Sequence, residues 1–160
     1  MFGLTALGTF HTAISLVAVV AGLIALFRDK AISPNNLVGK IYIWTTVITC
    51  LTGFGIFQHG GFGKPHVLGI ITLVVLGIAA LAGKTKLFGR ASRAVETVSY
   101  SATFLFHWIP AVTETSTRLP LGQPLVSSAE DPALKAATGV LVLLFLIGAT
   151  LQVRRLRVKG

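Results

Sequence analysis

Five apolar segments, each close to 20 residues long, dominate this chain and limit what it can fold into. They cover residues 2–27, 37–57, 66–82, 94–112 and 132–153. A helix needs about 20 mostly apolar residues to cross a bilayer. Only 12% of the residues are charged, about half the fraction of an ordinary soluble domain. The sequence therefore predicts an all-α integral membrane protein, with residues 1–160 forming one domain of five transmembrane helices.

The loops between these segments differ in charge. The net charge of +9 could suggest nucleic-acid binding, but the basic residues form short clusters between apolar runs, which is the pattern of cytoplasmic loops. We therefore expect no nucleic-acid partner, an N-terminus outside and a C-terminus in the cytoplasm. The clusters lie after the first segment, after the third and in the tail: Arg28, Lys30, Lys40, Lys84, Lys86, Arg90, Arg93, Arg154, Arg155, Arg157 and Lys159.

Polar side chains recur on single faces of the first four segments. Small and polar residues on a spanning helix normally face other helices rather than lipid. The fifth segment is almost wholly aliphatic, so we expect a four-helix core bundle and a peripheral fifth helix that faces lipid or mediates oligomer contacts. The clearest stripe is in the fourth segment, with spacings of three, four and seven: Glu96, Tyr100, Thr103, His107 and Glu114.

The four histidines all fall toward the expected outer side of the membrane. At a rise of 1.5 Å per residue, His11 and His107 each lie roughly 10 Å below the outer edge. His59 and His66 flank a short glycine-rich turn and lie near the surface. Titratable groups at membrane depth are costly and usually mark a functional site.

Several short motifs carry a resemblance to a known family. These are Phe10-His11, the run Leu37-Val38-Gly39-Lys40-Ile41-Tyr42, and Gly61-Phe62-Gly63-Lys64-Pro65-His66. With them, the first four segments resemble a family of uncharacterised bacterial multi-pass membrane proteins. The resemblance implies a topology and a location in a bacterial inner membrane, and it implies no activity. It departs at Asn35-Asn36, where members of the family often carry a basic residue or a histidine.

The leading functional hypothesis is a histidine-lined site that opens outward and binds haem b for electron transfer. A haem between transmembrane helices needs two axial imidazoles from facing helices, and His11 and His107 are the candidates. The likeness to bis-histidine membrane cytochromes b is architectural only.

Two alternatives stay open. Imidazole and carboxylate ligands suit Zn²⁺ or Cu²⁺, so His59, His66 and Glu114 could form a non-haem metal site. The chain could instead be a non-catalytic membrane subunit or a small-solute carrier. The partners expected in every case are the lipid bilayer and either further copies of the chain or a larger membrane complex.

Overall fold

The computed structural model describes residues 5–57, 61–85 and 87–158, and all regular structure in these ranges is helical. The all-α prediction is confirmed. Thr5, Asn36 and Asp131 stabilise the starts of three helices, because a side-chain oxygen of each accepts a backbone N–H of the first turn. The elements are α1 (Ala6–Asp29), α2 (Leu37–Gly53), α3 (Lys64–Lys84), the short 3₁₀ helix η1 (Gly89–Ala91), α4 (Ser92–Arg118) and α5 (Pro132–Val158).

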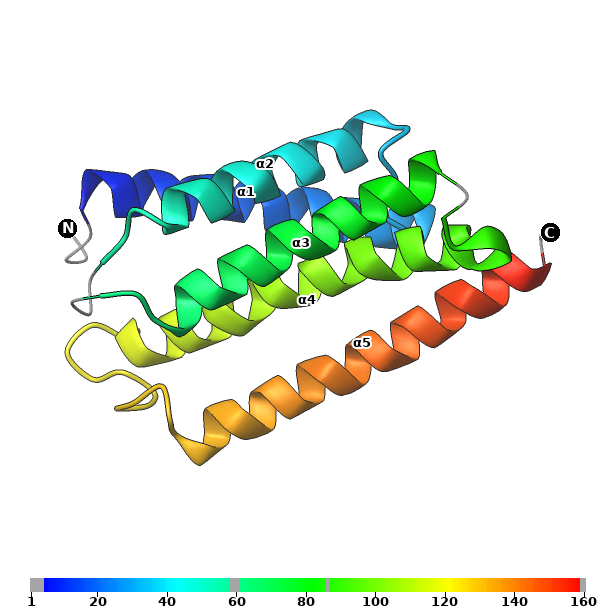
Figure 1. The fold of residues 1–160 in the computed structure, drawn as a ribbon. Helices are drawn as coiled ribbons and strands as arrows, with labels where there is room; N and C mark the ends of the chain where they lie inside the picture. The colour runs from blue at the N-terminus through cyan, green and yellow to red at the C-terminus, as the bar shows by residue number, and fades with distance from the viewer. Residues whose placement is uncertain (1–4, 58–60, 86, 159–160) are drawn as a thin grey trace.

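The helices run alternately up and down, so the bundle has two distinct ends (Figure 1). The start of α1, the α2–α3 loop and the α4–α5 loop lie at one end, here called the N-end. The α1–α2 loop, η1 and the end of α5 lie at the other, the C-end. Each half of the bundle is named after its end.

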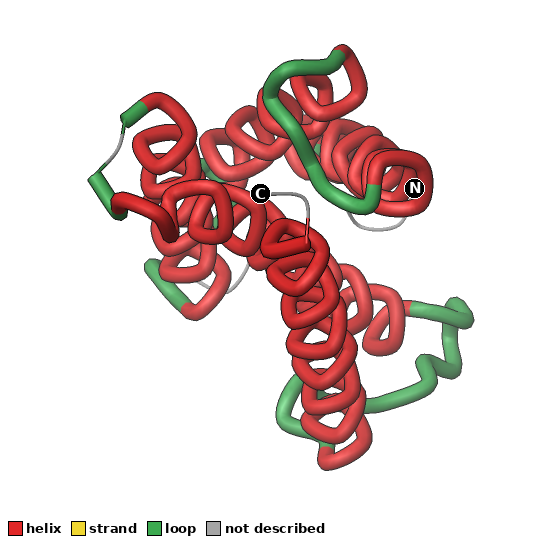
Figure 2. Tube along the Cα trace, turned by 90° about the vertical axis from the view of Figure 1, so that its right-hand side faces the viewer, coloured by secondary structure: helices red, strands yellow, loops and turns green. Residues whose placement is uncertain are grey.

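Helix packing gives a four-helix core with one outlying helix. The α1–α2 and α3–α4 pairs pack closely, α2 also contacts α3, and α1 meets α4 over a short stretch. Among the described helices, α5 packs only along α4. Figure 2, which looks along the helices, shows α5 beside the core rather than within it. The predicted peripheral position of the fifth helix is therefore confirmed.

Length and apolar character qualify only three of the described helices as membrane spans, not five as predicted. These are α1, α3 and α5. Helix α2 has 17 residues, because it ends at Gly53 rather than continuing to Phe57. Helix α4 is long enough but too polar along one face. It also continues through Pro110 to Arg118 instead of ending at Val112.

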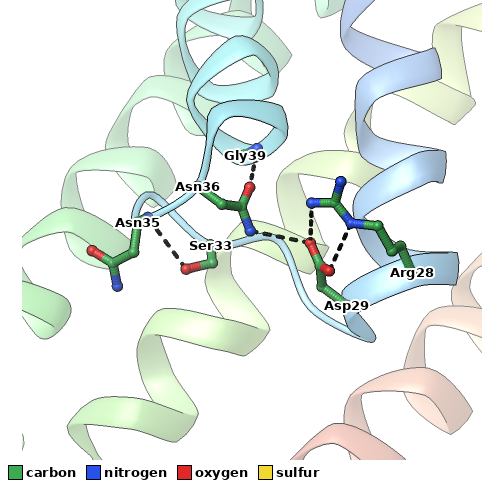
Figure 3. A network of polar contacts seen from close by, with 6 residues as sticks. All are labelled: Arg28, Asp29, Ser33, Asn35, Asn36 and Gly39. Carbon is green, nitrogen blue, oxygen red and sulfur yellow. Dashed lines mark hydrogen bonds and ion pairs between the residues drawn. The ribbon is translucent and has the colours of Figure 1, made fainter.

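The C-end half is held by small residues and a tight turn. Ala18, Ala21, Ala25 and Ala79 are buried there. At the turn, Asn36 bonds both the Gly39 N–H and the carboxylate of Asp29, which also pairs with Arg28 (Figure 3). A Cβ on Gly39 would collide with the backbone of Ser33. This half therefore brings its helices into close contact through small side chains.

Candidate functional site

One face of α2 forms a polar seam through the middle of the bundle. Tyr42, Thr46 and Thr49 are buried and Thr52 is half-buried along this face. The hydroxyls of Thr46 and Thr52 donate to the carbonyls of Tyr42 and Ile48, each at 2.8 Å. Their protons are thereby committed to the backbone, as is usual for threonine in an apolar helix. Each hydroxyl can then only accept a further hydrogen bond.

His107 reaches this seam from α4. Its Nε2 lies 3.0 Å from Thr46 Oγ1. Because a hydroxyl has one proton and that of Thr46 is used, His107 Nε2 must be the donor. The neutral ring then leaves Nδ1 with a lone pair, and the described residues give this atom no hydrogen-bond partner. The Tyr42 ring packs edge-on against the imidazole, with centroids 6.0 Å apart.

A second hydrogen bond joins α2 and α4 on the C-end side of His107. The Tyr42 hydroxyl and Thr103 Oγ1 are 2.8 Å apart, and both side chains are fully buried. Thr103 donates its proton to the carbonyl of Tyr100, so Tyr42 donates to Thr103. The hydroxyl protons of Tyr42 and Thr103 are thus both donated to oxygens within the bundle. These two hydrogen bonds fix the ring of Tyr42 beside His107.

His11 reaches the same seam from α1, nearer the N-end. Its Nδ1 lies 3.1 Å from Thr52 Oγ1. The proton of Thr52 is also committed, so His11 Nδ1 donates to it, and the Thr49 backbone is a second hydrogen-bond partner of the ring. The ring lies against Gly53, where an added Cβ would come within 3.2 Å of His11 Cε1. The glycine at this position allows the imidazole to lie flat against the end of α2.

The two imidazoles bond to the same helix, α2. Their threonine partners are six residues apart on α2, which is about 9 Å along the helix. The rings therefore meet the seam at two levels rather than at the single depth expected from the sequence. Each is buried or half-buried and is hydrogen-bonded to a threonine of α2.

This arrangement does not fit axial ligation of haem b. A haem iron needs both imidazole nitrogens on one axis with the macrocycle between them, and the two rings are bonded to α2 at levels about 9 Å apart. The bare nitrogen of His107 is Nδ1, which lies next to the ring carbon that carries Cβ. Backbone and Cβ crowd that position for a macrocycle, whereas a single ion can reach it.

The other predicted metal ligands are not gathered in the described residues. His59 lies outside them. His66 is sandwiched between Phe57 and Phe62, with ring centroids 5.0 and 5.1 Å apart, and its Nδ1 accepts the Gly63 N–H at 3.2 Å. Glu114 pairs with Arg118 at 2.6 Å. No group of three metal-binding side chains occurs in the described ranges.

The fourth-helix stripe predicted from the sequence faces inward only in its middle. Tyr100, Thr103 and His107 are buried, whereas Glu114 is exposed and Glu96 lies against Gly83 of α3. Sequence analysis did not single out Thr46, the partner of His107. The sequence did contain a signal for it, because Thr46 lies four residues after Tyr42 and therefore shares its helix face.

Comparison with known proteins supplies no relative: no family model, no curated protein and no solved structure matches this chain. The site must therefore be interpreted from its own geometry.

Proposed function

We propose that all five long helices cross a membrane, including the two that length and composition alone do not qualify. The three apolar helices α1, α3 and α5 run in the same direction (Figure 1). Three parallel spans require two return crossings, which α2 and α4 supply. The 17 residues of α2 extend about 26 Å, close to the roughly 30 Å of a bilayer core. The middle of the polar stripe of α4, with Tyr100, Thr103 and His107, is buried in the bundle and so avoids lipid.

The exposed surface supports this placement. Large apolar side chains cover the outward faces of the three apolar helices, a pattern that soluble monomers rarely show. Examples are Leu16 and Val20 on α1, Val74 on α3, and Leu144 and Leu151 on α5, each more than half exposed.

The charge distribution favours a cytoplasmic C-end. Arg28, Lys84, Arg90, Arg93 and Arg155 lie at or near that end, whereas the N-end holds Lys64, Arg118 and Lys135 close to the acids Glu114, Glu130 and Asp131. Under the positive-inside rule this gives an outside N-terminus. The histidines would then lie in the outer half, in a bacterial inner membrane as the family resemblance suggests.

Within that membrane bundle, the protein would bind a metal ion through His11 and His107. A single observation carries this proposal: each imidazole is held by a hydrogen bond from one ring nitrogen to a threonine oxygen of α2 whose own proton is already used. Protein ligands to metals are held this way, since the second hydrogen bond sets the tautomer and the orientation of the ring. Zinc and copper, the metals expected from the sequence, both accept imidazole nitrogen.

Metal content of the detergent-purified full chain tests the proposal. We expect about one equivalent of bound metal after incubation with Zn²⁺ or copper and removal of the excess. The double variant His11→Ala with His107→Ala should lose it. The variant His66→Asn is the matched control, because asparagine keeps an acceptor for the Gly63 N–H while removing one imidazole. Equal metal in the wild type and the double variant would refute the assignment.

The haem b hypothesis names the same two histidines, but the separate levels of their rings on α2 argue against it. An optical spectrum of the purified protein, oxidised and then reduced with dithionite, decides between them. A Soret band with sharp reduced α and β bands would require both rings to leave their threonines. Assembly of the chain into a homo-oligomer or a larger membrane complex stays a prediction.

A further inference from the structure

One side chain of α5, Gln152, fixes the relative depth of three helices at the C-end. Ser101 Oγ of α4 donates to Gln152 Oε1, and Gln152 Nε2 donates to the Lys30 carbonyl just after α1, each at 2.9 Å. The depth of α3 is fixed by Glu96 of α4, which lies against Gly83. The glutamine lies about 30 Å along α5 from its start, which is the thickness of a bilayer core. Residues beyond this level therefore lie at headgroup depth.

Basic side chains from three helices gather just beyond the Ser101–Gln152 bond. Counted at 1.5 Å per residue, Arg154 lies about 3 Å beyond the bond along α5, and Arg93 lies about 12 Å beyond it along α4. Lys84, next to the contact between α3 and α4, lies between these depths. A headgroup layer is roughly 5–8 Å thick, and long basic side chains bend several Å to reach it. We call these exposed residues the C-end cation belt: Lys84, Arg93, Arg154, Arg155 and Arg157.

Acids of the described ranges do not neutralise the C-end cation belt. None of its members makes an ion pair within those ranges. Of the two acids near this end, Asp29 is paired within α1, and Glu96 follows Arg93 by three residues and so offsets one charge. The basic side chains described at the N-end, in contrast, pair with Glu114 or Glu130. The belt therefore keeps an excess of positive charge that an anionic partner would neutralise.

Exposed apolar side chains continue the faces of the belt toward the middle of the bundle. Leu81 lies three residues before Lys84 on α3, and Leu151 lies three residues before Arg154 on α5, with Ile147 one turn deeper. Residues three or seven apart share a helix face, and these three apolar side chains are each more than half exposed. Each strip thus has a cation at its outer end and apolar surface below it. A phospholipid has the complementary order, with a charged headgroup followed by acyl chains.

We propose that the C-end cation belt binds anionic phospholipids, with their phosphates against the basic side chains of α3, α4 and α5 and their acyl chains along Leu81 and Leu151. This inference rests on the proposed membrane placement of the helices and is independent of a metal at the histidines. Arginine donates paired hydrogen bonds to phosphate. Each basic side chain near an anionic lipid surface strengthens binding about fivefold. Zwitterionic lipids carry a compensating cation and bind less tightly.

The first test uses the wild-type full chain in nanodiscs that contain a photoreactive phosphatidylglycerol or the matching photoreactive phosphatidylcholine. Mass spectrometry of the digested protein locates the crosslinks. We expect phosphatidylglycerol to label the end of α3, the start of α4 and the end of α5 more than the N-end. Added salt should reduce this preference, because it screens exposed charges. Equal labelling by the two lipids, or phosphatidylglycerol labelling mainly at the N-end, would overturn the inference.

Charge variants identify the side chains responsible. The triple variant Lys84→Gln, Arg154→Gln and Arg155→Gln should reduce the preference for phosphatidylglycerol, measured as the ratio of the two lipids retained by the purified protein, at least about tenfold. The matched control removes three cations at the N-end, with Lys64→Gln, Arg118→Gln and Lys135→Gln, and should change the ratio less than about twofold. The variant Arg154→Lys with Arg155→Lys keeps the charge and should keep most of the preference. Equal losses in the two triple variants would contradict a site at the C-end.

Extraction of membranes with alkaline carbonate separates this inference from the placement on which it rests. A chain that is released into the soluble fraction would refute the membrane placement and the lipid site together. A chain that stays in the membrane but retains both lipids equally would overturn the lipid site alone, and the five crossings and the metal proposal would stand.

Discussion

The two halves of this bundle solve the same packing problem with different residues. In the C-end half, alanines and Gly22 let α1 approach α2 and α4 closely, and the core residues there are mostly apolar. In the N-end half, threonines and histidines fill the same space and satisfy one another through hydrogen bonds. One half packs through small apolar side chains and the other through hydrogen-bonded polar ones, and both kinds of packing occur along the same helices.

Crowding the C-end half should have the largest effect on stability. A Cβ at Gly22 would lie 2.6 Å from the ring of Phe104 and 3.1 Å from that of Tyr42. Because Tyr42 is fully buried and anchored to Thr103, the rings have little room to yield. We expect Gly22→Val to lower the free energy of unfolding by about 1–3 kcal/mol, measured by SDS titration of the detergent-solubilised protein.

Gly148 on α5 provides the control, since nothing lies within 4 Å of a Cβ built there. Gly148→Val changes the same atoms on an open helix face and should leave the free energy of unfolding nearly unchanged. Similar losses in both variants would show that the close approach at Gly22 is not what holds the C-end half together.

The boundary between the halves is the bond from Tyr42 to Thr103. Tyr42→Phe leaves the buried Thr103 hydroxyl without its donor, and we expect a loss of about 0.5–1.5 kcal/mol in the free energy of unfolding. A double-mutant cycle with Thr103→Val should give a coupling energy of the same size. A coupling energy near zero would mean that the two hydroxyls stabilise the bundle independently.

Sequence patterns predicted the helices well and the site only in part. Apolar length located all five helices, and the stripe of α4 correctly placed Tyr100, Thr103 and His107 inside. Packing decides which helices lie next to one another, and a single sequence does not show this. The sequence therefore could not predict that His11 and His107 bond to threonines on α2 rather than face each other across a cofactor. The role of Thr46 depends on where the α4 side chains arrive, which periodicity within α2 does not encode.

Removing the N-cap of α2 should have a smaller effect on stability, and it tests what stabilises the C-end turn. Asn36→Ala removes the acceptor for the Gly39 N–H and the donor to Asp29 (Figure 3), and should cost about 1 kcal/mol of unfolding free energy. Asn35→Ala is the matched neighbour, because Asn35 bonds to Ser33 only through its backbone N–H. Equal effects at both positions would show that the backbone of the turn, rather than the Asn36 side chain, provides its stability.

The smallest effect belongs to the N-end surface, where Lys64 joins the start of α3 to the α4–α5 loop through Glu130. The hydrogen bond from Lys64, with the more distant Lys135, holds the pKa of the Glu130 carboxyl below its usual range. A pKa lowered by folding means that the stabilisation is complete above the carboxyl's unfolded value of about 4.3 and is lost as the pH falls through the folded value.

Amide hydrogen exchange of the α4–α5 loop should therefore accelerate on acidification relative to the intrinsic exchange rate, and this dependence should be absent in Glu130→Gln. Lys64→Gln should reduce it more than Lys135→Gln, since Lys135 Nζ lies 3.6 Å from the carboxylate. The groups are fully exposed, so added salt should weaken the effect. If the loop shows the same pH profile in Glu130→Gln as in the wild type, the N-end loop is held by its own backbone turns, and the polar character of this half is confined to the buried seam on α2.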